Sequence, residues 1–318
     1  MAHLETVFMF SGQGSQYFHM GNSLYEANPV FRNWMRRLDC LARTLAGCSV
    51  IDAVYSPQRG KGDVFDNIIL THPAIFMTEY SLAQSLIHEG IRPDMVLGAS
   101  LGSFAAAAVA GFLEVEDALR AVMEQALAFA DCCEPGGMIA VMADPVLFLE
   151  DFLEDCSELA AINFSSHFVI SARKGELGGI EAALTKRSVT YQRLPVAFAF
   201  HSKWIDKARA RFESFMRSIQ HRRGRLPLAC CDQSSVLSDI AGDYFWDVVR
   251  RPIRFRDTIA GLEQQHARRY IDVGPAGTLA TFLKNSLPSG TRSLVHAILT
   301  PFGTDQKNLA AVLASMQN

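Results

Sequence analysis

Short apolar runs recur along this chain and separate longer segments of mixed polarity. Residues 6–10, 95–97 and 194–200 hold almost only apolar side chains, which is typical of buried strands in a parallel sheet. Residues 103–112 follow the second run after a single turn, and their many alanines predict a helix that packs close to the sheet. We therefore predict strands that alternate with helices up to about residue 130, which indicates an α/β fold.

The pattern changes after residue 135, where the apolar runs become shorter. Residues 138–142, 159–162 and 168–171 are predicted to be short strands, and residues 177–186 a helix. We predict a smaller domain over residues 136–194. The large domain is then formed by residues 1–135 and 195–318, because the chain returns to it after the insertion.

The turn after the second apolar run is Gly98-Ala99-Ser100-Leu101-Gly102, the layout of a nucleophile elbow. Such a turn exposes a serine between a strand and a helix, and it needs glycine on both sides because a Cβ there would collide with the chain. The N-terminal N–H groups of the next helix would face negative charge developing at Ser100. Since the motif is short, an ordinary glycine-flanked turn is the alternative.

The turn after the first apolar run is Ser11-Gly12-Gln13-Gly14-Ser15-Gln16. A nucleotide site is not expected, because G-x-G-x-x-G is absent and no P-loop lysine follows. The backbone N–H of Gln13 could pair with that of Leu101 to form an oxyanion hole for an intermediate at Ser100. A polar turn without chemistry is the other interpretation.

A serine nucleophile needs a base, and the chain holds nine histidines. His201 stands directly after the third apolar run, so we expect it at the end of a buried strand where a loop opens. A histidine in such a place can equally be an ordinary buried residue. Its assignment as the base therefore rests on its combination with the two glycine-rich turns.

Together, five motifs resemble the malonyl-CoA:acyl carrier protein transacylase family over nearly the whole chain. They are the two glycine-rich turns, His201 with the apolar run before it, Thr71-His72-Pro73-Ala74-Ile75-Phe76 and Asp272-Val273-Gly274-Pro275. The resemblance implies a large α/β-hydrolase-like domain with a mainly parallel sheet and a small ferredoxin-like subdomain. It also implies that Ser100 accepts the acyl group, that His201 is its base, and that the N–H groups of Gln13 and Leu101 bind the oxyanion.

In this family backbone carbonyls hold the histidine, so no third acidic residue is needed. A segment around residues 246–252 usually carries an asparagine whose backbone helps, and here Val248 stands in that place. True α/β-hydrolases also use G-x-S-x-G, but they require an acid and then a histidine near the C-terminus. They also have no counterpart of the glycine-rich turn at residues 12–14.

The chain departs from the family pattern at positions that bear on the substrate. Ala99 and Ser103 replace the usual histidine and glutamate around the nucleophile. Gln125 stands where malonyl-specific members have an arginine that binds the free carboxylate of the substrate. A neutral amide cannot replace that charged, bidentate contact, so malonyl should bind poorly unless Arg120 or another cation substitutes for it.

Three further residues are predicted to help select the acyl group. His72 stands where the family commonly has glutamine, while Phe198 and Phe200 precede the proposed base. Phenylalanine at these two positions favours an apolar acyl pocket, although both rings could belong to an ordinary strand core. The substrate-binding residues we predict are therefore Gln125, His72, Ala99, Phe198 and Phe200.

The overall pattern resembles the stand-alone acyl hydrolases of trans-acyltransferase polyketide synthase pathways, which remove acyl groups from carrier proteins. We expect an acyl carrier protein with a phosphopantetheine-linked acyl group as partner, and neither a cofactor nor a metal. An acyl-CoA:carrier-protein transferase is the second hypothesis. A catalytically inactive docking subunit is the third, and the joint presence of Ser100, His201, Gly98 and Gly102 argues against it.

Composition restricts the alternatives. A net charge of −3 with 30 basic and 33 acidic residues shows no nucleic-acid footprint. Two arginine clusters, at residues 222–225 and 250–256, could meet an acidic carrier protein or simply be solvated. The seven cysteines lack metal-ligand spacing, and the longest apolar stretch is shorter than the roughly 20 residues that span a bilayer. We therefore expect a cytoplasmic protein with reduced thiols and no membrane segment.

Overall fold

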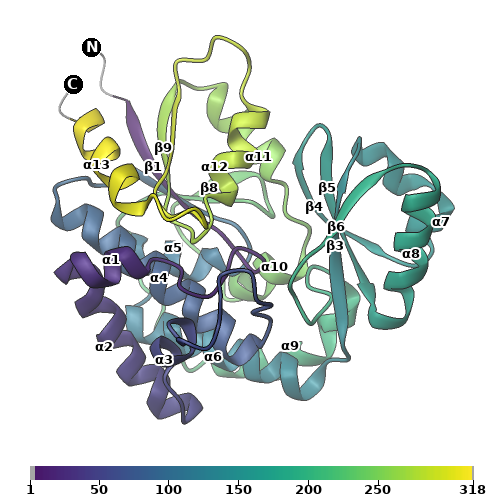
Figure 1. Cartoon of the computed structure of the whole chain (residues 1–318), viewed down its shortest axis with the longest axis horizontal. Helices are drawn as coiled ribbons and strands as arrows, with labels where there is room; N and C mark the ends of the chain where they lie inside the picture. Colours follow the sequence, from purple (N-terminus) through teal and green to yellow (C-terminus); the bar gives the residue numbers. More distant parts are fainter. Residues whose placement is uncertain (1–3, 317–318) are drawn as a thin grey trace.

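Two sheets organise the chain in this computed structural model, which describes residues 4–316 (Figure 1). The larger sheet has the strand order β10-β9-β1-β2-β7-β8. All neighbouring pairs in it are parallel except β7 and β8. Its strands are β1 (Glu5–Phe10), β2 (Met95–Gly98), β7 (Leu228–Cys230), β8 (Ser235–Leu237), β9 (Arg268–Asp272) and β10 (Leu294–Ala297).

Helices cover both faces of this sheet. The helices that precede the smaller sheet are α1 (Asn22–Ala27), α2 (Pro29–Ala46), α3 (Val50–Val54), α4 (Ile68–His88), α5 (Gly102–Ala110) and α6 (Val115–Cys132). Those that follow it are the 3-10 helix η2 (Lys203–Ala208) and α9 (Arg209–Met216), α10 (Tyr244–Arg250), α11 (Phe255–Glu263), α12 (Thr278–Ser286) and α13 (Asp305–Met316).

Alternation along β1 explains the two layers of helices. Phe8 and Phe10 belong to the large core shared with α2, α4, α5 and α6. Val7 and Met9 point to the opposite face and pack in a second core with side chains of α11 and α12. Because both faces are covered, β1 is apolar from Val7 to Phe10, as expected for a central parallel strand.

The smaller sheet is antiparallel and has the order β4-β5-β3-β6. Its strands are β3 (Gly136–Met142), β4 (Glu158–Phe164), β5 (His167–Arg173) and β6 (Thr190–Arg193), with η1 (Pro145–Leu149), α7 (Asp151–Glu154) and α8 (Lys174–Lys186) between them. This is the ferredoxin-like arrangement. Ile139 and Val141 pack toward α8, whereas Met138 and Ala140 face the large sheet's side of the molecule.

Most predicted elements are present, and the mixed α/β fold is confirmed. The predicted strand over residues 194–200 is wrong, because this segment is irregular backbone. Its residues 198–200 are buried through side-chain packing rather than sheet pairing, and residues 194–197 are partly buried. The predicted alternation before residue 130 is also incomplete, since four helices lie between β1 and β2. The division into two domains at residues 135/136 and 194/195 stays a prediction, although the smaller sheet runs from Gly136 to Arg193.

Within residues 4–316, no helix is both long and apolar enough to cross a membrane. The seven cysteines, all within this range, are free thiols. Neither observation places the protein in a compartment, so its cytoplasmic location remains an expectation.

Candidate active site

The turn that carries Ser100 joins β2 to α5, and close backbone packing shapes it. A Cβ at Gly102 would lie 2.2 Å from the carbonyl oxygen of Phe10, and a Cβ at Gly98 would lie 2.5 Å from Cα of Ser103. Only glycine fits at these two positions. Ser100 itself has a φ of 55°, in the left-handed region that side chains rarely adopt. This strained conformation is typical of an exposed nucleophile.

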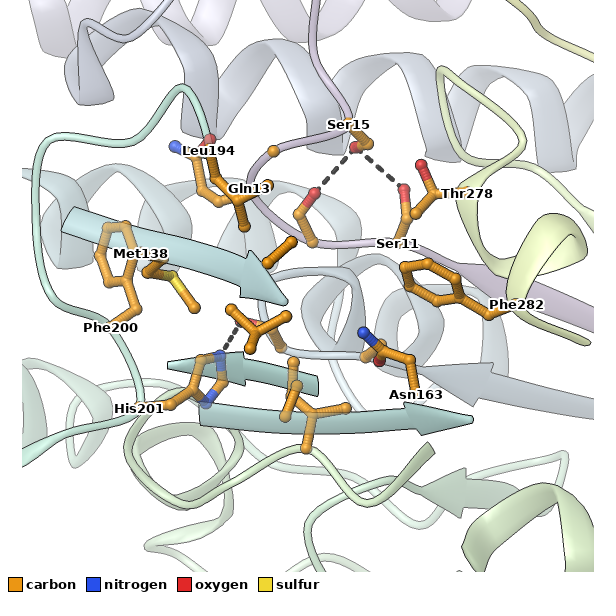
Figure 2. Close-up of a pocket in the computed structure, with 18 of the residues that line it drawn as sticks. Ser11, Gln13, Ser15, Met138, Asn163, Leu194, Phe200, His201, Thr278 and Phe282 are labelled. Atoms are coloured by element: carbon orange, nitrogen blue, oxygen red, sulfur yellow. Dashed lines mark hydrogen bonds between the residues drawn. The ribbon is translucent and has the colours of Figure 1, made fainter. Parts of the chain in front are cut away.

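His201 lies opposite Ser100, with Nε2 at 2.8 Å from the Ser100 Oγ (Figure 2). Its Nδ1 is 2.7 Å from the carbonyl oxygen of Arg251. Because that carbonyl can only accept, Nδ1 must carry the hydrogen, and Nε2 is left to accept the proton of the Ser100 hydroxyl. No carboxylate bonds to this ring within the described part of the chain. The predicted backbone support is therefore observed.

The backbone that holds His201 comes from residues other than the one expected. We predicted Val248, but the contacts are made by the carbonyl groups of Val249 and Arg251. Val249 accepts the backbone N–H of His201 at 3.0 Å. Burial lowers the pKa of His201 to about 4, against a smaller opposing effect of the Arg251 carbonyl. The imidazole is thus neutral at pH 7 and free to act as a base.

The loop of residues 11–16 crosses directly over this turn. A Cβ at Gly12 would lie 2.9 Å from Cβ of Ser100 and 3.4 Å from the Leu101 nitrogen, so glycine permits the close approach. Among the hydrogen bonds of the described turns and loops, none is donated by the backbone N–H of Gln13 or of Leu101. Both therefore remain available near Ser100, as an oxyanion hole requires.

The side chain of Gln13 is fixed to α4. Its Nε2 donates to the Thr71 Oγ1 at 2.7 Å and lies 2.6 Å from the His72 Nδ1. Burial lowers the pKa of His72 to about 3, so the ring is neutral and its Nδ1 can accept this bond. His72 is thus a support for the Gln13 loop rather than a lining residue of the cavity.

A cavity of about 370 Å³ opens beside Ser100 and His201, a size typical of small-ligand sites (Figure 2). It lies between the two sheets, with walls from β3, β4 and β5 on one side and from the residue 11–15 loop and α12 on the other. Among the residues that the structure describes, no lysine, arginine, aspartate or glutamate lines it. The lining residues that are apolar include Met138, Ala140, Met142, Ala161, Val169, Leu194, Phe200, Ile253, Leu279 and Phe282.

Only two of the five predicted substrate contacts line this cavity, namely Ala99 and Phe200. Phe200 packs against a second layer of rings, with its centroid 5.8 Å from His72, 5.4 Å from Phe129 and 6.1 Å from Phe198. His72, Phe198 and Gln125 do not line this cavity, so their predicted contacts with substrate stay predictions. Gln125 lies one helical turn before Phe129 on α6.

Gln125 is fully buried, and neither atom of its amide has a hydrogen-bond partner among the described residues. A carboxylate in the cavity would therefore find no cation in the wall, and Arg120 forms an ion pair with Asp117 instead.

Sequence reasoning missed the other polar residues of the cavity. Asn163 and His167 lie at the turn between β4 and β5, and Nδ2 of Asn163 is 3.0 Å from Nδ1 of His167. Gln192 of β6 and Thr278 of α12 complete the polar part of the lining. No sequence signal indicated them, since they are single polar residues in short strands and helix ends far from the two turns.

The arginine cluster at residues 250–256 is engaged in ion pairs. Arg250 pairs with Asp206 at 2.6 Å, Arg251 with Asp247 at 2.8 Å, and Arg254 and Arg256 both with Asp257. Arg222 of the other cluster pairs with Glu114. These neighbouring carboxylates reduce the net positive charge that a docking partner would meet. In residues 4–316 no group of three or more histidine, cysteine or acidic side chains could hold a metal ion.

Comparison with known proteins places the chain in a family. The family model for the acyl transferase domain matches residues 7–318, and the chain therefore belongs to this family. It is 44% identical over 308 residues to the polyketide biosynthesis acyltransferase homolog PksD of Bacillus subtilis, covering 96% of this chain and 95% of that one. It is 43% identical over 307 residues to the homolog BaeD of Bacillus velezensis, with 96% and 95% covered.

A solved structure supports the same assignment. The loading acyltransferase from the avermectin modular polyketide synthase matches with a TM-score of 0.89 and 26% identity, covering 98% of this chain and 100% of that one. The resemblance seen in the sequence is confirmed, and with it the combination of a mainly parallel sheet and a smaller antiparallel one.

Proposed function

We propose that this protein is a hydrolase that removes monocarboxylic acyl groups from acyl carrier proteins in polyketide biosynthesis. The observation that carries the proposal is the hydrogen bond from Ser100 to a neutral His201 at the edge of an uncharged, largely apolar cavity. The relatives named polyketide biosynthesis acyltransferase homologs support the pathway. The partner is the acyl group on the phosphopantetheine arm of a carrier protein, and the reaction takes place in the cytoplasm.

The proposed reaction has two halves. Ser100 Oγ attacks the thioester carbonyl while His201 Nε2 takes the hydroxyl proton, and the N–H groups of Gln13 and Leu101 stabilise the oxyanion. The C–S bond breaks, and the departing sulfur takes the proton from His201. Water then attacks the ester on Ser100, His201 accepts the proton of that water, and Ser100 leaves with the proton as a hydroxyl.

The lining of the cavity supports a monocarboxylic acyl group. A malonyl carboxylate moved from water into this cavity would lose hydration without meeting a lysine or arginine. An apolar acyl chain loses nothing comparable and gains about 25 cal/mol for each Å² that it buries. This preference for an apolar acyl chain holds whether the acyl group then passes to water or to a second thiol.

Transfer between coenzyme A and a carrier protein is the second candidate, because the family itself is one of acyl transferases. The two reactions share the acyl-enzyme and differ in what attacks it. We propose water as the main acceptor because the chain departs from malonyl-specific members at Gln125 and resembles stand-alone homologs.

The deciding experiment supplies an acetyl- or butyryl-loaded carrier protein and follows intact masses of all species in H₂¹⁸O. Hydrolysis gives free carrier protein and a carboxylic acid with one ¹⁸O. When a second carrier protein with a free thiol is added, transfer increases the mass of that protein by the mass of the acyl group. If transfer to the added carrier protein is faster than hydrolysis in the same reaction mixture, the second candidate replaces the proposed function.

A further inference from the structure

The loop that offers the Gln13 N–H is held by a chain of buried hydroxyl groups that the proposed reaction does not itself use. Ser15 Oγ donates to the carbonyl oxygen of Gly12 at 2.8 Å. Ser11 Oγ lies 3.0 Å from Ser15 Oγ, and Figure 2 shows both bonds at Ser15. On its other side, Ser11 Oγ lies 2.9 Å from Oε1 of Glu79 on α4, and the Ser11 N–H donates to the same oxygen at 2.7 Å.

This row of hydrogen bonds ends at the carbonyl group of Gly12. The Gly12 carbonyl and the Gln13 N–H belong to one peptide unit, which is planar and trans. A hydrogen bond that fixes the direction of the carbonyl therefore fixes the direction of the N–H, which points the opposite way. Donation to the carbonyl also polarises the amide and strengthens its N–H as a donor.

We propose that Ser15 and Ser11, backed by the Glu79 carboxyl, orient the Gly12–Gln13 peptide and thereby aim the Gln13 N–H at the oxyanion. These three are positioning residues, since they act through that peptide. The inference rests on the proposed function in one respect, the use of the Gln13 N–H at Ser100.

The hydrogens in the chain favour a neutral Glu79. Ser15 gives its only hydroxyl hydrogen to Gly12, so the hydrogen between Ser11 and Ser15 must come from Ser11. When Ser11 donates to Ser15, the hydrogen between Ser11 and Glu79 comes from a protonated carboxyl, whereas an ionised Glu79 accepts the Ser11 hydroxyl hydrogen instead. Glu79 is fully buried, and within residues 4–316 it forms no ion pair with a lysine or arginine. Burial and the nearby Asp272 raise its pKa well above the usual value, against the bonds from Ser11.

The direct test is Ser15→Ala, measured by the rate at which an activated ester such as p-nitrophenyl acetate acylates Ser100. We expect about a tenfold slower acylation at saturation with little change in KM, less than the 10²–10³ lost with a direct oxyanion donor. Affinity for an alkyl trifluoromethyl ketone, whose carbonyl forms a tetrahedral oxyanion with Ser100, should fall by the same factor. Ser81→Ala is the matched control, because that hydroxyl is buried on α4 and has no partner among the described residues.

Glu79 supplies a second pair of variants, which keeps the test valid if Ser15→Ala folds poorly. Glu79→Gln retains one donor and one acceptor and should acylate within about twofold of wild type, whereas Glu79→Leu removes both and should resemble Ser15→Ala. Unchanged acylation in folded Ser15→Ala or Glu79→Leu overturns the inference.

The ester separates this inference from the proposed function. A wild type that is acylated by the ester but releases nothing from carrier proteins would refute the hydrolase and leave the inference open to the same variants. A wild type that the ester cannot acylate would overturn both.

Discussion

The two residues that meet at the cavity reach it by different means. Ser100 and His201 both have a positive φ, 55° and 58°. Ser100 is held by its neighbours in sequence, since it stands between strand β2, which ends at Gly98, and helix α5, which begins at Gly102. His201 follows irregular backbone and is held by carbonyl groups of Val249 and Arg251, about 50 residues away.

This difference predicts which substitutions should disturb the position of each residue. The conformation of the Ser100 turn depends on local sterics, so a single added methyl group should disturb it. The position of His201 depends on several hydrogen bonds, each worth about 1 kcal/mol, so the loss of one should be tolerated. We expect the two regions to respond differently to substitutions that leave both reacting residues in place.

The largest effect is expected for Ser100→Ala, which removes the proposed nucleophile. The folded variant should form no acyl-enzyme, and its kcat should fall by at least about 10⁴-fold. Intact mass after incubation with an acylated carrier protein gives the first result, and release of free acid the second. A folded Ser100→Ala protein that still turns over would refute the mechanism.

His201→Ala should leave Ser100 in its turn, because that turn does not depend on the imidazole. We expect a loss on the order of a hundredfold or more in both acylation and deacylation. Single-turnover mass measurements separate the two steps. An unchanged rate in both steps would remove His201 from the site.

Gly102→Ala tests the local sterics of the turn. Its Cβ would meet the Phe10 carbonyl oxygen at 2.2 Å, and backbone cannot move aside cheaply. We expect the free energy of unfolding to fall by about 3 kcal/mol, with strongly reduced acylation of Ser100. Gly261→Ala is the control, because this glycine of α11 has open space around its Cβ position and should gain slightly in stability. Equal stability of the two variants, measured by urea denaturation, would contradict the steric account.

The difference between local and long-range support also explains which parts of the structure the sequence could predict. The strands β1 and β2, the helix α5 and the two turns were recognised because their determinants are adjacent residues. The segment 194–200 was misread as a strand, since its apolar composition is that of a buried strand while its burial comes from rings such as Phe129. The bond from Ser11 to Glu79 spans 68 positions, and no local pattern could have indicated it.

The predicted substrate residues show the limit most clearly. Position 125 is recognisably unusual, but its sequence neighbours could not show that Gln125 would be fully buried and absent from the lining of the cavity. The roles of Ser100, His201, Gln13 and Leu101 stay predictions, which the experiments above test.

The acid limb of activity tests the environment of His201. Its burial lowers the pKa to about 4, so the imidazole stays neutral, and able to accept a proton, well below the ordinary value of 6.5. We expect kcat/KM at pH 5 to remain within about twofold of its value at pH 7. Because the unfolded chain binds more protons between pH 4 and 6.5, this histidine lowers stability as pH falls through that window. Circular dichroism at each pH must therefore show folded protein. A fall in kcat/KM centred at pH 6.5 would mean that the imidazole is exposed.

The smallest effect is expected for Ser171→Ala, which removes one support of the segment before His201. Ser171 Oγ donates to the carbonyl of Phe200, and both residues are buried. We expect the free energy of unfolding to fall by about 1 kcal/mol and kcat/KM to fall a few-fold, because the other two backbone contacts still hold His201. Ser157→Ala provides the matched control: its buried hydroxyl donates to the Leu153 carbonyl at 2.6 Å, and Ser157 does not line the cavity. It should lose similar stability and keep full activity. If Ser171→Ala instead abolished turnover, His201 would depend on a single contact, and its difference from the Ser100 turn would disappear.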